Sequence, residues 1–242
     1  MGAIKIQNLT KKYKDVTALN SLNLEIHEGE LFSLLGVNGA GKTTAIKLLS
    51  CLAKASSGDA FLMNNSIVTN PDKVKAIIGI SPQETAVAMG LTVKENLELM
   101  CGAHGYNKEK TEKKVKKLTE EFGFGQIMNK RAGKLSGGWQ RRLSIAMALV
   151  GESKILFLDE PTLGLDVIAR SELWDIIKGL KGKITVILTT HYMEEAEELS
   201  DRVGIMKDGN LVALGTVDEL KSRAGKEKFD EAFIHFIREA NV

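Results

Sequence analysis

The stretch Gly36-Val-Asn-Gly-Ala-Gly-Lys-Thr-Thr44 decides the fold of this chain. Its spacing matches the pattern G-x-x-x-x-G-K-[ST], in which glycine N–H groups and a helix N-terminus surround phosphate oxygens. The pattern needs a strand before it and a helix after it, and both are predicted, because residues 31–35 suit a buried strand and residues 45–52 a helix. The alternative is a glycine-rich turn without a ligand, but this context favours a phosphate site.

The chemistry expected of this loop follows from its residue types. Lys42 would reach the β- and γ-phosphates of a nucleotide, and the hydroxyl of Thr43 would bind magnesium. The remaining loop positions expected to contact the nucleotide are Gly36, Asn38, Gly39, Ala40, Gly41 and Thr44.

Length and composition restrict the classes of protein that fit. The chain has 242 residues, which suffices for one large domain or a core with a lobe. Its net charge of +2 gives no strong case for binding nucleic acid or an anionic membrane. We find no apolar run near the roughly 20 residues of a spanning helix and no secretory signal. Cys51 and Cys101 lack metal-type spacing, so reduced thiols in a cytosolic protein are expected.

Hydrophobic patterning predicts an α/β core interrupted by a helical lobe. The predicted strands are residues 3–9, 22–27, 31–35, 58–64, 76–80, 154–158 and 184–190. Between them, residues 91–150 have helical patterning, which includes a capping box at Thr92-Val-Lys-Glu95. Asp208-Gly209 separates two apolar segments, as the turn of a β-hairpin does.

Two further motifs carry polar groups that suit nucleotide chemistry. A buried strand ends in Asp159-Glu160, where Asp159 is placed to hold magnesium and Glu160 to accept a proton from an attacking water. In Leu135-Ser-Gly-Gly-Trp-Gln-Arg-Arg142, Ser136 can cap the following helix, and the two glycines expose its first N–H groups. This stretch fits a second anion site and a plain capped helix equally well.

Five motifs occur in the order found in ATP-binding cassette ATPases: the phosphate loop, the Ser-Gly-Gly segment, Asp159-Glu160, Gly164-Leu-Asp166 and His191. The chain resembles this family from Tyr13 to about Gly215. The resemblance implies an α/β fold with a P-loop NTPase (RecA-like) core, an N-terminal antiparallel β subdomain and an inserted α-helical subdomain. Its implied domain is 1–225, with the helical subdomain at about 84–150, followed by a C-terminal amphipathic helix at 226–242.

The resemblance also implies a role for each motif residue. Tyr13 would stack on adenine, and Gln83 would touch magnesium and the attacking water. His191 would contact the γ-phosphate, and Asp166 would link two sites. Ser136, Gly137 and Gly138 would cover an ATP molecule. One departure is Trp139, which stands where the family usually has glutamine.

As partners, the resemblance implies a second copy of this chain, with two ATP molecules sandwiched in a homodimer, and separate transmembrane permease subunits at the cytoplasmic face of the membrane. Residues 91–98 and 189–197 resemble the exporter branch. An importer ATPase, or a soluble cassette ATPase acting on ribosomes or DNA, is the alternative, although the near-neutral charge disfavours nucleic acid.

Two segments are expected to be structural. Residues 107–121 are rich in lysine, but interleaved glutamates favour a solvated helix face over lipid binding. Phe229, Phe233, Phe236 and Ile237 have helical spacing, which favours packing on the chain's own domain over contact with a partner.

Overall fold

The computed structural model describes residues 2–240, which divide into two compact units. The first unit combines the chain up to Lys75 with the chain from Lys181 onward, and the second is Ala76–Leu180. Within residues 2–240, no helix has both the length and the apolar character needed to cross a bilayer.

The first unit contains an antiparallel sheet with the strand order β2-β1-β4-β5. Its strands are β1 (Gly2–Tyr13), β2 (Val16–His27), β4 (Ser57–Leu62) and β5 (Asn65–Ser66). Strand β1 is longer than the predicted strand at residues 3–9, because it continues through Tyr13, which pairs with Val16. Pairing with β2 extends the strand past the point where apolar alternation ends.

A second, buried group of strands in the first unit has the order β10-β9-β3-β8. Its members are β3 (Leu31–Gly36), β8 (Thr185–Thr190), β9 (Arg202–Lys207) and β10 (Asn210–Gly215). Strand β3 runs parallel to β8 and β9, and every residue of β3 and β8 is buried. The burial of β3 confirms the prediction of a buried strand at residues 31–35, and complete burial is typical of parallel strands that are covered on both faces. The predicted hairpin also forms, with φ of 47° at Asp208 and 78° at Gly209.

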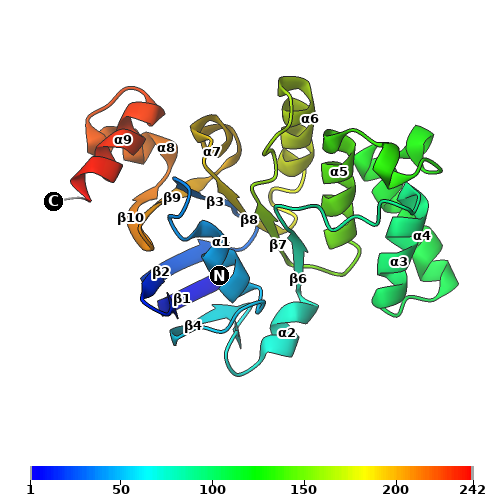
Figure 1. The fold of residues 1–242 in the computed structure, drawn as a ribbon, viewed down its shortest axis with the longest axis horizontal. Coiled ribbons are helices and arrows are strands. Elements are labelled where there is room, and N and C mark those ends of the chain that lie inside the picture. The colour runs from blue at the N-terminus through cyan, green and yellow to red at the C-terminus, as the bar shows by residue number, and fades with distance from the viewer. Residues whose placement is uncertain (1, 241–242) are drawn as a thin grey trace. The chain divides into compact units, whose positions relative to one another are not determined.

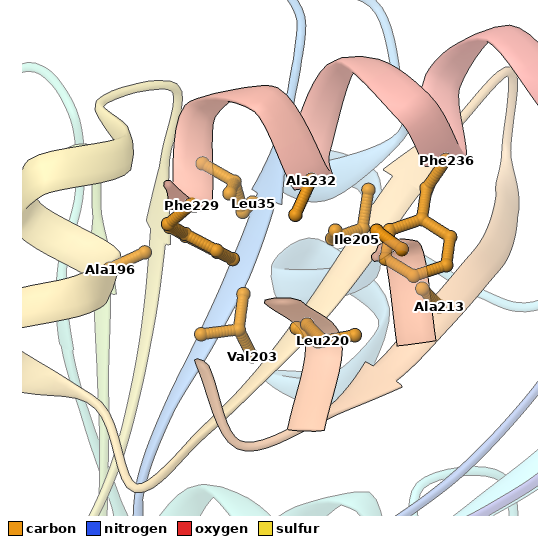
Figure 2. Packing of buried hydrophobic residues seen from close by; sticks show 10 residues of the cluster. Leu35, Ala196, Val203, Ile205, Ala213, Leu220, Phe229, Ala232 and Phe236 are labelled. Carbon is orange, nitrogen blue, oxygen red and sulfur yellow. The ribbon is translucent and has the colours of Figure 1, made fainter. Parts of the chain in front are cut away.

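The helices of the first unit are α1 (Lys42–Leu49), α7 (Met193–Leu199), α8 (Val217–Ala224) and α9 (Phe229–Glu239), and α2 (Pro71–Ala76) lies at its boundary. Figure 2 shows Phe229, Ala232 and Phe236 of α9 directed toward Val203 and Ile205 of β9. The C-terminal helix therefore packs on its own domain, as predicted. Residues 241–242, at the end of the implied range 226–242, lie outside the described part of the chain.

The second unit pairs two parallel strands, β6 (Ile78–Ser81) and β7 (Ile155–Asp159), with a set of helices. The helices are α3 (Val93–Ala103), α4 (Lys108–Phe122), α5 (Gly137–Ala148), α6 (Val167–Lys178) and the short η1 (Gly125–Ile127) and η2 (Ala132–Lys134) (Figure 1). The capping box at Thr92 is present. Strand β6 starts two residues later than predicted, because Ala76 ends α2.

Lysines and glutamates pair along the exposed side of α4. Lys113 lies 2.7 Å from Glu109, and Lys117 lies 3.6 Å from Glu121. Val115 and Phe122 on the other side of the helix are buried. These contacts fit the predicted solvated face.

Both cysteines are free thiols. Cys101 is buried and Cys51 is half-buried, and burial raises the pKa of each thiol. A raised pKa lowers the fraction of thiolate, so neither cysteine has the character of a reactive nucleophile.

Candidate nucleotide site

The phosphate loop connects the end of β3 to the start of α1. Gly39 and Gly41 have φ of 86° and 100°, in the region that favours glycine. Lys42 is only 4% exposed, and its Nζ donates hydrogen bonds to the backbone oxygens of Gly36 at 2.7 Å and Val37 at 3.2 Å. The lysine is therefore held over the loop by the loop's own carbonyls.

Neighbouring backbone packs tightly against two glycines of this loop. A Cβ atom at Gly36 would lie 2.5 Å from the backbone oxygen of Met206, and one at Gly41 would lie 2.5 Å from that of Ala18. Both distances are too short for a methyl group, so the loop requires glycine at each position.

The hairpin turn at Gly209 also supports the phosphate loop. Its N–H donates to the backbone oxygen of Ala40 at 3.1 Å, and its own oxygen accepts from the N–H of Asn20 at 2.9 Å. The sequence identified this residue only as part of a turn. Its contact with the loop joins segments about 170 residues apart in the chain, and no local pattern reports such a contact.

His191 emerges beside the phosphate loop. Strands β3 and β8 are parallel, with Leu35 opposite Thr190, so the residues that follow these two leave the sheet at the same edge. The His191 ring lies 4.1 Å from the ring of Tyr192, centroid to centroid. The first unit thus places the residues that follow β3 and β8, the phosphate loop and His191, at one edge of the sheet.

Tyr13, the residue expected to stack on adenine, is the last residue of β1 and is 46% exposed. The Nζ atom of Lys11 lies 4.7 Å from the centroid of its ring. This cation adds to the stacking character of an exposed aromatic side chain.

The second unit holds the carboxylates and Gln83. Strands β6 and β7 are parallel, with Ser81 opposite Leu158, so Gln83 and Asp159 follow at the same edge. Asp159 is 5% exposed and Glu160 is 8% exposed. Glu160 has a φ of 47°, which is uncommon for a residue with a side chain. Carboxylate and amide oxygens are hard ligands of the kind that magnesium prefers, and Asp159 and Gln83 supply one of each in this unit.

Ser136 is the N-cap residue of α5, but one expectation for it is wrong. Its backbone is extended, and within the described chain its side chain accepts no capping hydrogen bond. By contrast, the side chain of Asp166 caps α6 by accepting from the N–H of Ala169 at 2.9 Å. The Ser136 hydroxyl is therefore not used by its own helix, and both Ser136 and Gly137 are exposed.

Gly138 and Trp139 fix the start of α5 against its surroundings. A Cβ atom at Gly138 would lie 2.9 Å from the Cβ of Ala169, so glycine allows close approach of α5 to α6. The Trp139 ring lies 6.2 Å from the ring of Phe124 and 4.5 Å from the guanidinium of Arg142. The tryptophan thus takes an apolar packing position in place of the family's polar glutamine.

Comparison with known proteins places these features in one family. Residues 19–163 match the ABC transporter family. The chain is 38% identical to the daunorubicin/doxorubicin resistance ATP-binding protein DrrA of Streptomyces peucetius, over 92% of this chain and 68% of DrrA. It is 36% identical to the probable multidrug ABC transporter ATP-binding protein YbhF of Escherichia coli, over 98% of this chain and 42% of YbhF. It therefore spans less than half of YbhF.

Solved structures agree with these relatives. The structure of an ATP-binding subunit of an ABC transporter aligns with 97% of this chain and with 99% of that subunit's own chain, with a TM-score of 0.85 and 26% sequence identity. The cassette MJ0796, solved as a dimer in a post-hydrolysis state with ADP and Pi, matches 88% of this chain and 98% of its own, with a TM-score of 0.78 and 29% identity. The predicted fold class is confirmed.

Proposed function

We propose that this chain, which belongs to the ABC transporter family, works as a homodimer that binds two ATP molecules between its copies and drives a separate membrane permease. The chain is the ATP-hydrolysing subunit of an exporter, and it is related to the drug-resistance and multidrug ATP-binding proteins. The prediction of an exporter ATPase is confirmed by its likeness to these relatives.

We assign nucleotide binding to the phosphate loop and its neighbours. Tyr13 stacks on the adenine ring, and Lys42 leaves its loop carbonyls to bind the β- and γ-phosphates. The loop backbone surrounds the phosphates through Gly36, Asn38, Gly39, Ala40, Gly41, Thr43 and Thr44. The observation that supports this assignment is the shape of the loop, in which a Cβ atom at Gly36 or Gly41 would lie only 2.5 Å from neighbouring backbone oxygens.

We assign hydrolysis to side chains at the ends of the strands. Glu160 accepts the proton of the attacking water, Gln83 orients that water, and His191 contacts the γ-phosphate. Glu160 is only 8% exposed, and this burial suits a base that is shielded from bulk water. Thr43, Gln83 and Asp159 would hold magnesium, which would supply positive charge to the β- and γ-phosphates.

A second copy of the chain is proposed to supply Ser136, Gly137 and Gly138 to each ATP. The Ser136 hydroxyl is exposed and not used as a cap. Nearby, Val167 and Ile168 are 78% and 73% exposed beside Asp166, which is unusual for apolar side chains without a partner surface. The related MJ0796 cassette is dimeric. These observations favour two-fold pairing through this face.

The transported compound is proposed to be an apolar or amphiphilic molecule. Relatives are named for resistance to daunorubicin and doxorubicin, for multidrug transport and for phospholipid transport. The permease would bind that compound, and this chain would act at the cytoplasmic face through contact with the permease. Purification of the chain together with a membrane-embedded subunit from its native host would test this assignment.

The substitution Glu160→Gln tests the homodimer and the base together. The variant keeps the shape of the side chain but cannot accept the proton, so ATP turnover should fall by about 10²-fold or more while ATP binding remains. Unhydrolysed ATP should then hold the dimer closed. Size-exclusion chromatography with ATP is expected to show a dimer, and without nucleotide a monomer.

The matched control adds Ser136→Arg to Glu160→Gln. The arginine should block closure over the ATP of the second copy, so the double variant should bind ATP and remain a monomer. A dimer that forms equally well in the double variant would contradict the shared site. Normal turnover by Glu160→Gln would show instead that another group is the base.

A further inference from the structure

We propose that Arg141 is a positioning residue that attaches the Gln83 segment to helix α5, so that this segment and Ser136 move together during ATP hydrolysis. The inference deepens the proposed function and rests on the roles assigned there to Gln83 and Ser136. All of the contacts that carry it lie within the second unit.

The side chain of Arg141 binds two successive backbone carbonyls. Its Nη1 donates to the oxygen of Pro82 at 2.6 Å, and its Nη2 donates to the oxygen of Gln83 at 2.5 Å. Arg141 is 5% exposed. Hydrogen bonds from a charged donor are stronger than neutral ones, and loss of these two would leave two part-buried carbonyls without this partner. The backbone at Gln83 is therefore fixed to α5 although the Gln83 side chain is exposed.

A second contact supports the same attachment one turn further along the helix. The hydroxyls of Ser81 and Ser144 lie 2.9 Å apart and are buried. Ser81 ends β6, so both the strand end and the segment after it are attached to one side of α5. Arg141 lies five residues after Ser136, within a continuous helix of 12 residues. Because a short helix behaves as a rigid body, displacement at Gln83 should move the helix start that carries Ser136.

The far end of the same segment is fixed by a buried asparagine. Asn96 of α3 is fully buried, and its side chain accepts from the N–H of Ala88 at 2.9 Å and donates to the oxygen of Ala88 at 3.1 Å. Two buried polar side chains thus hold the segment between Gln83 and Ala88 at its ends. A displacement of the segment is passed to α5 and α3 instead of being absorbed within it.

The residue type matters at position 141. A guanidinium is planar and presents several N–H groups in a fixed fork, so it can bind two carbonyls at once. A lysine offers a single ammonium on a flexible stem, and a methionine of similar length offers no donor. The series Arg141→Lys and Arg141→Met therefore removes the attachment in steps while keeping most of the side-chain volume.

The experiment is a double-mutant cycle in ATP turnover, with Gln83→Ala as the second substitution. Arg141→Met should lower kcat by about 10²-fold, because misplacement of reacting groups by about 1 Å has effects of that size. The KM for ATP should change by less than about three-fold, since the phosphate loop is untouched. If Arg141 acts through the Gln83 segment, the double variant should be no slower than the slower single variant. Arg141→Lys should recover part of the lost kcat.

The matched control is Arg202→Met in the first unit. Arg202 also donates to backbone and side-chain oxygens, those of Glu25 and Glu30, so its loss removes comparable bonds. This control should lower the melting temperature, keep kcat within about two-fold, and combine additively with Gln83→Ala.

Two results would overturn the inference. One is additive loss in the cycle of Arg141 with Gln83, and the other is a loss confined to KM or to thermal stability. If Arg141→Met does not fold, the same criterion applies to Arg141→Lys. If Gln83→Ala alone hydrolyses ATP at the normal rate, the proposed role of Gln83 fails, and the inference fails with it. If Gln83→Ala is slow and both Arg141 variants are normal, the inference alone fails.

Discussion

The phosphate loop and the Ser-Gly-Gly segment are both glycine-rich helix starts, yet the chain builds them differently. In the phosphate loop, Lys42 is buried and bonded to loop carbonyls, and Gly41 lies against the backbone of β2. In the Ser-Gly-Gly segment, Ser136 is exposed and makes no capping bond, and a Cβ atom at Gly137 would meet only Leu165 Cδ2, at 3.8 Å.

The two segments therefore differ in whether their polar groups are used within the chain or are exposed at its surface. The contacts that hold the phosphate loop in shape all come from the same unit of the same chain, from Ala18, Met206 and Gly209. The Ser-Gly-Gly segment presents polar groups outward, beside the exposed side chains of Val167 and Ile168. If the proposed homodimer forms, one chain should bind ATP by itself, and the second copy should cover that ATP.

The largest expected effect comes from placing the same methyl group in each segment. In Gly41→Ala the methyl would lie 2.5 Å from the backbone oxygen of Ala18, at a φ of 100° that alanine rarely adopts. A left-handed residue with a side chain costs about 1–3 kcal/mol. ATP affinity of the single chain should fall by about 10²-fold or more, as measured by equilibrium titration with a fluorescent ATP analogue.

Gly137→Ala is the matched control for this comparison. The space around Gly137 admits a methyl group, so ATP affinity of the single chain should stay within about two-fold. ATP-dependent dimer formation is the property that should weaken. Equal losses of ATP affinity in the two variants would show that the two segments do not differ as described.

An intermediate effect is expected from Gly209→Ala. Gly209 has a φ of 78°, and its Cβ would lie 3.1 Å from the backbone of Ala18, so the turn should shift away from Ala40. ATP affinity should fall by about ten-fold. Gly182→Ala is the control, because Gly182 has a φ of 75° but open space around its Cβ position. A similar loss in both variants would mean that backbone strain, and not support of the loop, causes the effect.

The smallest expected effect concerns the two helix caps of the second unit. Asp166→Ala removes the capping bond to Ala169 and should lower the free energy of unfolding by about 1 kcal/mol. Ser136→Ala should change it by less than about 0.5 kcal/mol, because the hydroxyl makes no such bond. Urea unfolding without nucleotide measures both. A loss of about 1 kcal/mol in Ser136→Ala would show that the hydroxyl caps its own helix.

Sequence reasoning succeeded where the signal is local. The phosphate loop, the capping box at Thr92 and the hairpin at Asp208-Gly209 each depend on a few adjacent residues whose backbone preferences are strong. The burial of β3 and β8 also followed from continuous apolar runs.

Sequence reasoning failed where long-range contacts decide the outcome. The extension of β1 through Tyr13 depends on pairing with β2, and the support of Ala40 by Gly209 joins distant segments. Arg141 gave no local sign that it binds Gln83, since a basic residue in a helix is usually solvated. The unused hydroxyl of Ser136 was missed because a serine before a helix normally caps it.

The left-handed backbone at Glu160 has a consequence for how this chain can change over time. Glycine and asparagine adopt a φ near 47° more readily than glutamate does, so either residue would relax the backbone there. Selection for thermal resistance alone would therefore favour loss of the carboxylate. If Glu160 is the base, as proposed, its persistence requires selection for ATP turnover, and a heat-stable descendant that lacks the carboxylate should bind ATP without hydrolysing it.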